Sequence, residues 1–280
     1  MAEENQNGCS PEACSGCEHA STCDSKQEDF SAHLNEFSQI KKVIGVISGK
    51  GGVGKSLVTA SLARQLREKG YTVGILDADI TGPSIPKMYG IHERADGTEE
   101  GIYPCIAKDE TRIMSINLLL DSEDAPVIWR GPVIAGVVTQ FWTDVMWGDL
   151  DVLLVDMPPG TGDVPLTVFQ SLPVDGVVIV TSPQSLVSMI VKKAYHMAEQ
   201  MNIPVLGIVE NYSYVNCPDC GKKISVFGES RVDEVATELG IEMLGKVPID
   251  KELAEAVENE TFYEIQNTYL KDISALLEKK

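Results

Sequence analysis

Short apolar runs, separated by longer amphipathic stretches, dominate the chain from Val43 onward. Each run is rich in Val, Ile and Leu at consecutive positions, which is typical of a strand buried on both faces of a parallel sheet. The five runs are residues 43–48, 73–77, 152–156, 177–181 and 205–209. Because they alternate with helical stretches, they predict an α/β fold with a doubly wound, mostly parallel sheet.

The stretch between the first two runs predicts a helix over residues 55–69. Leu57, Leu62 and Leu66 recur there at helical spacing, and Gly70 is a typical stop at a helix C-terminus. A polar, cysteine-containing excursion at residues 211–227 interrupts the alternation further along. The last twenty residues return to a helical period, so we expect a helix at that end as well.

The first 28 residues have a different composition from the rest. They hold four cysteines among Gly, Ser, Asn, Glu and Pro, with almost no aliphatic side chains to form a core. Only a bound metal or cluster would order such a segment. We therefore expect a cysteine-rich arm at 1–28 and an α/β domain at 29–280.

Composition narrows the range of partners. The chain has 280 residues, 43% of them hydrophobic, which is enough for a large core. Its 23 Lys and Arg against 42 Asp and Glu give a net charge of −19, which disfavours nucleic acid as a partner. The N-terminal residues lack the basic and apolar regions of a signal peptide, and no run of 18 apolar residues occurs. We expect a cytoplasmic protein that does not bind membranes.

A glycine-rich segment directly follows the first predicted strand and precedes the first predicted helix. It reads Gly49-Lys50-Gly51-Gly52-Val53-Gly54-Lys55-Ser56 and satisfies the P-loop pattern G-x-x-x-x-G-K-[ST]. Backbone N–H groups and the helix N-terminus would hold phosphates, Lys55 would reach the terminal phosphates, and the Ser56 hydroxyl would ligate Mg²⁺. The alternative is a glycine-rich turn with an incidental lysine.

Three aspartates and an asparagine end predicted strands. Asp77 and Asp79 close the second run, Asp156 closes the third, and Asn211 follows the fifth. Ligands of open α/β sheets bind at this carboxyl edge, so we expect the carboxylates near the phosphates. Loop capping is the alternative interpretation for both residues of the Asp77 and Asp79 pair, and a turn is the alternative for Asn211.

Cysteines form two groups with ligand-like spacing. Cys217 and Cys220 make a CxxC motif followed by Gly221, which supplies two thiolates, or half of a tetrahedral zinc or iron–sulfur site. A second subunit across a two-fold axis would complete the site. Half a zinc knuckle and a redox dithiol are the alternatives. An odd total of seven cysteines favours metal ligation over disulfides.

The arm has enough cysteines for a site of its own. These ligands are Cys9, Cys14, Cys17 and Cys23. Four thiolates close to one another suit either a [4Fe–4S] cluster or zinc, and the thiolates alone do not select between them. Cys105 lies in a mostly apolar stretch, and we interpret it as a small core residue.

Several dispersed motifs together resemble the Mrp/ApbC family of the MinD, ParA and nitrogenase-iron-protein superfamily. They are the loop at 49–56, Asp-Ala-Asp-Ile-Thr-Gly-Pro-Ser at 77–84, Trp129-Arg130-Gly131-Pro132, Asp-Met-Pro-Pro-Gly-Thr-Gly-Asp at 156–163, and Cys-Pro-Asp-Cys at 217–220. The resemblance runs from about residue 30 to about residue 277. The N-terminal cysteines are similar to the extension of the eukaryotic cytosolic branch, with a shorter first spacing.

The resemblance implies roles for individual residues. Lys50 would be the second lysine of a deviant Walker A loop, which reaches the partner subunit's nucleotide. Asp79 would position or activate the attacking water, with Asp77 nearer the Mg²⁺ shell. Asp156 would be the Walker B carboxylate, and Asn211 would bond adenine.

The function implied by the resemblance is a slow ATPase that carries iron–sulfur clusters. A homodimer would bind ATP and Mg²⁺, bridge a [4Fe–4S] cluster between its two CxxC motifs, accept it from cluster donors and pass it to apo-proteins. Two rivals share the nucleotide loop: a positioning ATPase similar to MinD or ParA, and an electron-transfer ATPase similar to nitrogenase iron protein.

Overall fold

A sheet of eight strands forms the centre of the chain in the computed structural model, which describes residues 33–79, 82, 84–120, 131–183, 187–266 and 268–277. The strand order is β12-β9-β8-β1-β7-β2-β6-β5. Only the β5–β6 pair is antiparallel in this sheet. The strands are β1 (Ser38–Ile47), β2 (Val73–Asp77), β5 (Cys105–Ile106), β6 (Arg112–Ser115), β7 (Gly148–Asp156), β8 (Gly176–Thr181), β9 (Val205–Glu210) and β12 (Met243–Lys246).

The five predicted strands correspond to β1, β2, β7, β8 and β9, and the predicted α/β fold class is confirmed. The sheet also contains β5, β6 and β12, which the apolar pattern did not predict. These strands are two to four residues long and lie toward the two edges of the sheet. A run that short gives too little periodicity to be recognised in a sequence.

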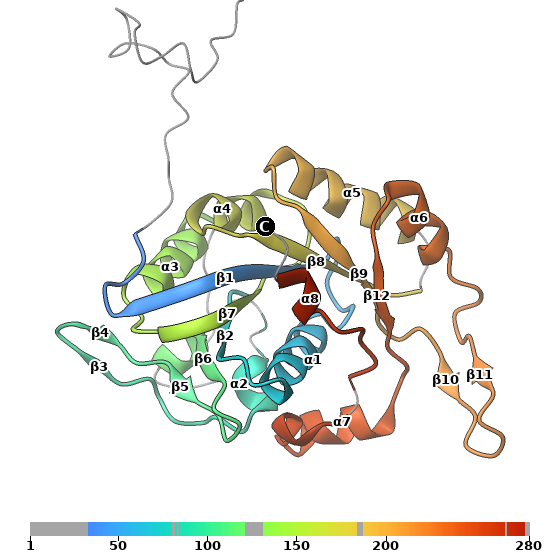
Figure 1. Ribbon diagram of the computed structural model, residues 1–280, viewed down its shortest axis with the longest axis horizontal. Coiled ribbons are helices and arrows are strands. Elements are labelled where there is room, and N and C mark those ends of the chain that lie inside the picture. The colour runs from blue at the N-terminus through green and yellow to red at the C-terminus, as the bar shows by residue number, and fades with distance from the viewer. Residues whose placement is uncertain are drawn as a thin grey trace, which may run out of the picture. The chain divides into compact units, whose positions relative to one another are not determined.

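Helices cover both faces of the sheet (Figure 1). The apolar side chains of β7 alternate between two core clusters, with Leu153 and Val155 on one face and Val152 and Leu154 on the other. The first cluster packs under α3 (Gly131–Thr143), α4 (Asp163–Ser171), α5 (Val187–Gln200) and α6 (Val232–Leu239). The second packs under α1 (Lys55–Glu68), α2 (Ile85–Met88), α7 (Lys251–Glu258) and α8 (Ser274–Leu277). Burial on both faces explains why these strands are continuous apolar runs.

Short elements complete the described chain. Two 3₁₀ helices occur, η2 (Ile116–Leu119) and η3 (Phe262–Glu264). Two small antiparallel pairs lie outside the main sheet, β3 (Gly97–Thr98) with β4 (Gly101–Ile102), and β10 (Val215–Asn216) with β11 (Lys223–Ile224).

The predicted helix over 55–69 is confirmed as α1, which ends at Glu68, and Gly70 follows in the left-handed region at φ 86°. The prediction of a helix in the last twenty residues is wrong for most of that segment. Only η3 and the four-residue α8 are helical among its described residues. Its backbone hydrogen-bonds to α1 instead: Arg64 donates to Ile265 O, and Gln65 donates to Leu270 O. These tertiary contacts replace the bonds that a local helix would make.

The carboxyl ends of the parallel strands meet at one edge. Asp77 in β2 is the register partner of Asp156 in β7, and Thr181 in β8 is the partner of Glu210 in β9. Strand β1 pairs in parallel with both β7 and β8, so its carboxyl end lies at the same edge. The glycine-rich loop follows directly from that end of β1. Residues far apart in the sequence are therefore brought together there.

A carboxylate at the opposite end of β7 predicts a pH-dependent contribution to stability. Asp151 accepts hydrogen bonds from Lys41 Nζ at 2.7 Å and from Thr72 N at 2.8 Å. The Lys41 side chain, and next the Thr72 N–H, lower the pKa of Asp151 to about 2. Because this folded-state pKa lies below the ordinary value of about 3.9, the carboxylate stabilises the fold above pH 4 and loses that effect between about pH 4 and pH 2.

Asp151→Asn is expected to lower the free energy of unfolding by about 1–2 kcal/mol at pH 7, a value discounted for partial solvent exposure. Urea denaturation measures it, and the difference from the unsubstituted protein should shrink toward pH 2. Asp149→Asn is the matched control, because Asp149 lies exposed in the same strand. Equal losses in both variants, or a loss independent of pH, would contradict the expectation.

Candidate functional site

The glycine-rich loop connects β1 to the N-terminus of α1. Gly52 and Gly54 have φ angles of 76° and 77°, in the left-handed region where other residues are strained. Gly54 N-caps α1 through its carbonyl, which accepts from Val58 N at 3.1 Å. A Cβ atom on Gly54 would lie 2.1 Å from Asn211 Nδ2. Glycine is therefore required at this position for two independent reasons.

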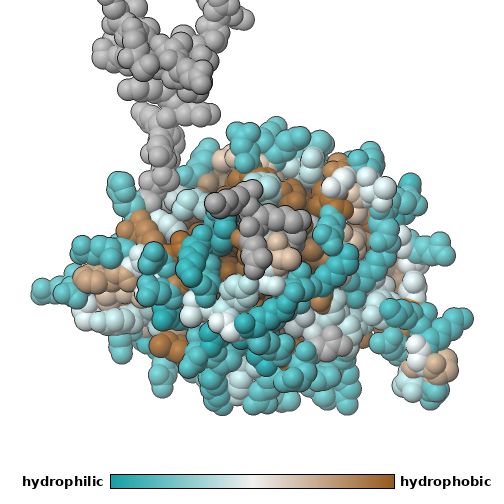
Figure 2. Space-filling view, in the orientation of Figure 1, coloured by the Kyte–Doolittle hydropathy of each residue, from teal (hydrophilic) through white to brown (hydrophobic). Residues whose placement is uncertain are grey.

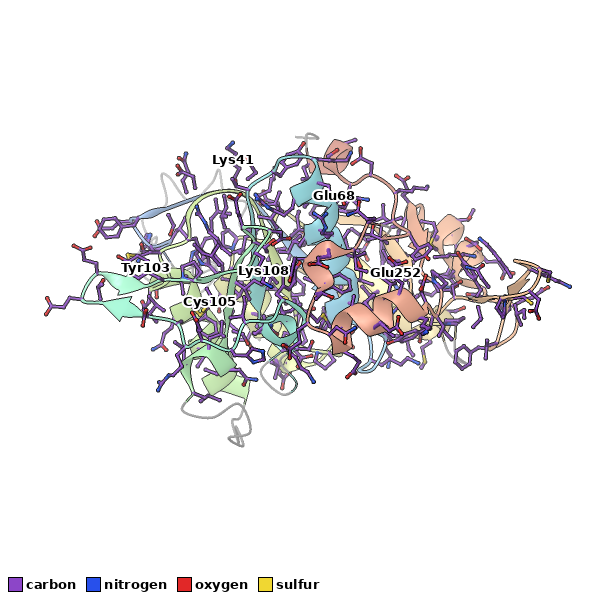
Figure 3. All side chains as sticks on the ribbon, turned by 90° about the horizontal axis from the view of Figure 1, so that it is seen from below. Lys41, Glu68, Tyr103, Cys105, Lys108 and Glu252 are labelled. Atoms are coloured by element: carbon purple, nitrogen blue, oxygen red, sulfur yellow. The ribbon has the colours of Figure 1, made fainter. Side chains whose placement is uncertain are left out.

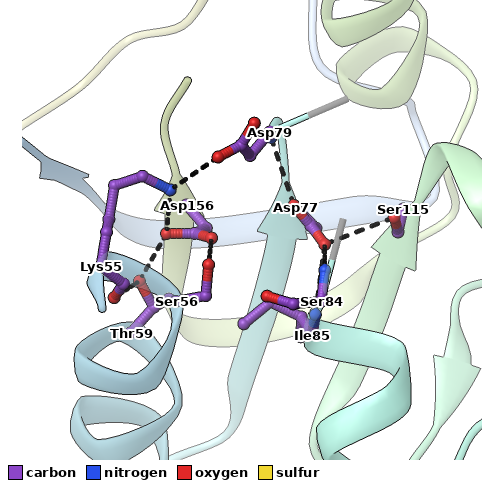
Figure 4. A network of polar contacts seen from close by, with 9 residues as sticks. All are labelled: Lys55, Ser56, Thr59, Asp77, Asp79, Ser84, Ile85, Ser115 and Asp156. Carbon is purple, nitrogen blue, oxygen red and sulfur yellow. Dashed lines mark hydrogen bonds and ion pairs between the residues drawn. The ribbon is translucent and has the colours of Figure 1, made fainter. Parts of the chain in front are cut away.

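Lys55 forms ion pairs with two of the predicted carboxylates (Figure 4). Its Nζ lies 2.8 Å from Asp156 Oδ1 and 3.5 Å from Asp79 Oδ2. The side chain is 5% exposed, so water screens these charges little. The structure thus brings together three side chains that are predicted to act on the phosphates, at the end of the loop that carries Lys55.

Asp156 has further partners on α1. Ser56 Oγ donates to its Oδ2 at 2.5 Å, and Thr59 Oγ1 donates to its Oδ1 at 2.9 Å. A hydroxyl and a carboxylate side by side are the hard oxygen donors that Mg²⁺ prefers, so Ser56 and Asp156 fit this ion. Sequence reasoning missed Thr59; its position one helical turn after Lys55 was the available signal.

Asp77 is fully buried, and backbone amides use both of its oxygens. Oδ1 accepts from Asp79 N at 3.2 Å, while Oδ2 accepts from Ser84 N at 3.2 Å and from Ile85 N at 3.3 Å. Burial, and next the nearby Asp156 charge, raise the pKa of Asp77 above its ordinary value. The alternative interpretation, a capping aspartate, describes these contacts. A role for Asp77 in the Mg²⁺ shell stays a prediction.

A cavity of about 350 Å³ surrounds the loop, and its lining includes Lys55, Ser56 and Asp79. A second cavity of about 250 Å³ adjoins it and is lined in part by Asn211 and by Pro248. Both cavities share Leu57, Tyr212 and Val257 as lining residues. The two cavities are therefore neighbours along these shared residues.

Asn211 is held against the loop in this structure. Its Nδ2 donates to Val53 O at 3.0 Å, and its Oδ1 accepts from Tyr212 N at 2.9 Å. These two bonds leave the Asn211 amide one further N–H and one further lone pair, which are enough to bond a base. Bonding of Asn211 to adenine stays a prediction. Lys50 is half-buried and is not among the residues that line either cavity, and its role at a partner's nucleotide also stays a prediction.

The CxxC motif lies in the turn of a hairpin that extends away from the sheet between β9 and α6 (Figure 1). Strands β10 and β11 flank it, and the turn closes through Gly221 N donating to Cys217 O at 2.9 Å. Gly221 supplies the left-handed φ of 70° that this turn needs. Cys217 is partly exposed and Cys220 is exposed.

The hairpin favours the thiolate form of one cysteine. The backbone N–H of Asp219, and next that of Cys220, lower the pKa of the Cys217 thiol. In the part of the chain that the structure describes, no group of three or more His, Cys, Asp or Glu side chains could hold a metal ion. The hairpin turn itself contributes two possible metal ligands, the thiols of Cys217 and Cys220.

Apolar side chains accompany the thiols on this hairpin. Ile224, Val226 and Phe227 are each about half exposed, at 48%, 55% and 49%. The face in Figure 2 is mostly hydrophilic, with apolar surface also visible on the protruding hairpin. The thiols thus lie beside a surface that can bury apolar area against another protein.

The remaining cysteines divide into two cases. The arm ligands Cys9, Cys14, Cys17 and Cys23 lie outside the described residues. Cys105 is described, and its interpretation as a core residue holds in part: it is half-buried on β5, at the end of the sheet, and packs against the second core cluster (Figure 3). Its burial is incomplete because β5 is an edge strand, with a neighbour on one side only.

None of the described helices combines the length and the apolar character needed to cross a membrane.

Comparison with known proteins gives a consistent picture. A family model described as ParA, NUBPL iron-transfer P-loop NTPase, matches residues 39–279. The iron-sulfur cluster carrier protein of Clostridium perfringens (strain 13 / Type A) is 47% identical over 262 residues, covering 88% of this chain and 92% of that protein. The protein of the same description from Methanocaldococcus jannaschii is 47% identical over 250 residues, covering 87% and 86%.

Solved structures agree with the fold. The nucleotide-binding protein of Archaeoglobus fulgidus in complex with ADP superposes with a TM-score of 0.75 at 43% identity, covering 82% of this chain and 90% of that one. The MinD cell division protein of Aquifex aeolicus has a TM-score of 0.54 at 20% identity, covering 78% and 86%, and shares the fold alone. With the P-loop geometry and the match over residues 39–279, this chain belongs to the NUBPL iron-transfer family of ParA-type P-loop NTPases.

Proposed function

We propose that this chain is an ATP-dependent iron–sulfur cluster carrier that holds a [4Fe–4S] cluster across a homodimer and transfers it to apo-proteins. The observation that carries the proposal is the junction of the two sites. Asn211, which contacts the nucleotide loop, lies six residues before Cys217 in the sequence. The relatives from C. perfringens and M. jannaschii bear the name of iron-sulfur cluster carrier protein, which supports the cargo.

In the proposed cycle the loop residues 49–56 bind the phosphates of ATP, and Lys55 leaves its two carboxylates to reach the terminal phosphates. Ser56 and Asp156 would hold Mg²⁺, which supplies charge neutralisation at the phosphates when bound. Asp79 positions the attacking water at the cavity. Lys50 of one subunit stabilises the transition state at its partner's nucleotide, and Asn211 bonds adenine.

The cluster is the cargo of this cycle. Cys217 and Cys220 of each subunit provide two thiolates, so that two hairpins provide the four that one [4Fe–4S] cluster takes. Cluster donors load the dimer, and apo-proteins accept the cluster. The cysteines of the arm at 1–28 hold a second centre, [4Fe–4S] or zinc. We place the protein in the cytoplasm, with no nucleic acid or membrane as a partner.

Cluster transfer tests the proposal. The protein, reconstituted anaerobically and characterised by Mössbauer spectroscopy, is mixed with an apo-protein that has a four-cysteine [4Fe–4S] site, and visible absorption of the re-isolated acceptor is followed. We expect the acceptor to gain a cluster, with a rate that ATP and Mg²⁺ change by about five-fold or more. A dimer that binds only zinc, or one that retains its cluster in the presence of the acceptor, would contradict the carrier function.

A further inference from the structure

A buried carboxylate joins the two ends of the cysteine hairpin. Glu210, the last residue of β9, is fully buried. Its Oε1 accepts from Ser213 Oγ at 2.5 Å, and its Oε2 accepts from Ser230 Oγ. No residue of the proposed nucleotide chemistry takes part in these two bonds. The carboxylate is therefore a polar group whose burial the nucleotide site does not explain.

The two serines lie at the two ends of the protruding segment. Ser213 precedes β10, and Ser230 follows β11. Ser230 Oγ also accepts from Val232 N at 3.2 Å, at the start of α6. One side chain thus fixes both ends of the 213–230 segment to the end of β9. We call the three residues Glu210, Ser213 and Ser230 the hairpin clamp.

The residue that follows Glu210 contacts the nucleotide loop, so the hairpin clamp and the loop are linked through a single residue. Asn211 follows Glu210 and bonds Val53 O, and its amide leaves no room for a side chain on Gly54. The backbone at this point is held on both sides: Asn211 N donates to Thr181 O at 2.8 Å, and Val247 N donates to Glu210 O at 2.8 Å. The bond from Asn211 to Val53 O therefore links the nucleotide loop directly to residues 210 and 211, inside a closely packed sheet.

We propose that Glu210 is a positioning residue that couples nucleotide binding at the P-loop to the position of the Cys217 and Cys220 thiols, through its bonds to both ends of the hairpin. The proposal rests on the proposed function, in that the thiols matter as cluster ligands. The coupling depends on two attachment points, the bonds from Ser213 and from Ser230 to Glu210. The first end is also held by backbone bonds, because Ser213 N donates to Val247 O at 2.9 Å and Ile249 N donates to Tyr214 O at 2.8 Å. The bond from Ser230 Oγ to Glu210 therefore adds the second end of the hairpin to the end of β9.

Substitutions in the clamp separate coupling from folding. Ser230→Ala removes one attachment, together with the bond from Val232 N at the start of α6, and changes no residue of β9 or of the nucleotide loop. Glu210→Gln keeps the shape and both attachments without the charge, because a serine hydroxyl that donated to the carboxylate can accept from the amide N–H instead. Ser230→Thr retains a hydroxyl and is the conservative rescue. Ser225→Ala is the matched control, since Ser225 lies exposed in the same hairpin and outside the clamp.

The measurement uses the full-length, cluster-free protein, so that it does not depend on cluster loading. Alkylation rates of Cys217 and Cys220 are resolved by peptide mass spectrometry with and without a non-hydrolysable ATP analogue and Mg²⁺, and Cys105 serves as the internal reference. We expect the nucleotide to change the two rates by about five-fold in the unsubstituted protein, Ser225→Ala and Ser230→Thr. In Ser230→Ala the change should fall below about two-fold, while nucleotide affinity stays within about two-fold; Glu210→Gln, which keeps both attachments, should retain the change.

A full nucleotide response in Ser230→Ala, or no response in the unsubstituted protein, overturns the coupling role. Loss of nucleotide affinity equal to the loss of response also overturns it, because the clamp would then only support the fold of the loop. Iron uptake by the same preparations is measured separately. An unsubstituted protein that takes up no iron would refute the carrier function and leave the alkylation result intact.

Discussion

Lys55→Ala is expected to weaken the binding of ATP and of ADP by at least about 100-fold, because the variant removes the one loop ammonium that is aimed at the phosphate cavity. The Lys55 side chain is 5% exposed and its ammonium pairs with Asp156 and Asp79. In the variant, neither water nor a neighbouring cation takes the place of this buried positive charge. Isothermal titration calorimetry with Mg²⁺ present measures the two affinities.

Lys50→Ala is the matched comparison within the same loop. Lys50 does not line the cavity, so nucleotide affinity should stay within about three-fold, while the turnover number falls by about 100-fold or more as a cross-subunit charge is lost from the transition state. Melting temperatures of both variants establish that they fold, and Lys55→Gln repeats the test with a side chain that still donates to Asp156. Equal loss of binding in Lys50→Ala and Lys55→Ala would contradict the assigned division of roles.

Cys217→Ala and Cys220→Ala are each expected to remove the bridging cluster. In a symmetric dimer one substitution eliminates two of four thiolates, and two remaining ligands do not hold a [4Fe–4S] centre. After anaerobic reconstitution, iron and sulfide should fall by about four each per dimer relative to the unsubstituted protein, with the iron of any arm centre unchanged. Iron and sulfide analysis on the dimer fraction from gel filtration provides the count.

Cys105→Ala is the control for this count. The thiol is half-buried at the edge of the sheet, where its Sγ approaches Glu93 O at 3.7 Å. Burial raises the pKa of Cys105, so the neutral thiol is favoured there, in contrast to Cys217. Iron content should be unaffected. Full cluster content in Cys217→Ala would remove the basis for a shared site.

The sequence predicted those parts of the site that depend on local order. The loop at 49–56 needs a strand before it and a helix after it, and both were visible as apolar patterns. Asp156 was also predictable, because a carboxylate that closes a buried strand must lie at the edge where the loop begins. Five strands of the sheet, β1, β2, β7, β8 and β9, likewise followed from the five apolar runs.

Contacts that depend on side-chain direction were harder to predict. The position of Thr59 one helical turn after Lys55 was a signal, but the pattern of apolar residues does not encode the rotation of α1 that turns Thr59 toward Asp156. The capping bonds of Asp77 depend on the path of the chain after Asp79. The predicted strand at 205–209 stops one residue before Glu210, and nothing in the sequence relates that residue to a serine twenty residues later.

The C-terminal segment that lies along α1 has a consequence for synthesis of the chain. Its hydrogen bonds to Arg64 and Gln65 span 201 to 208 residues, which is most of the polypeptide. Such contacts form only after residues 265 to 273 have left the ribosome. The helix that begins at the phosphate loop therefore acquires these supporting bonds only after about 200 further residues have been synthesised, and a nascent chain that has already made the loop still lacks them.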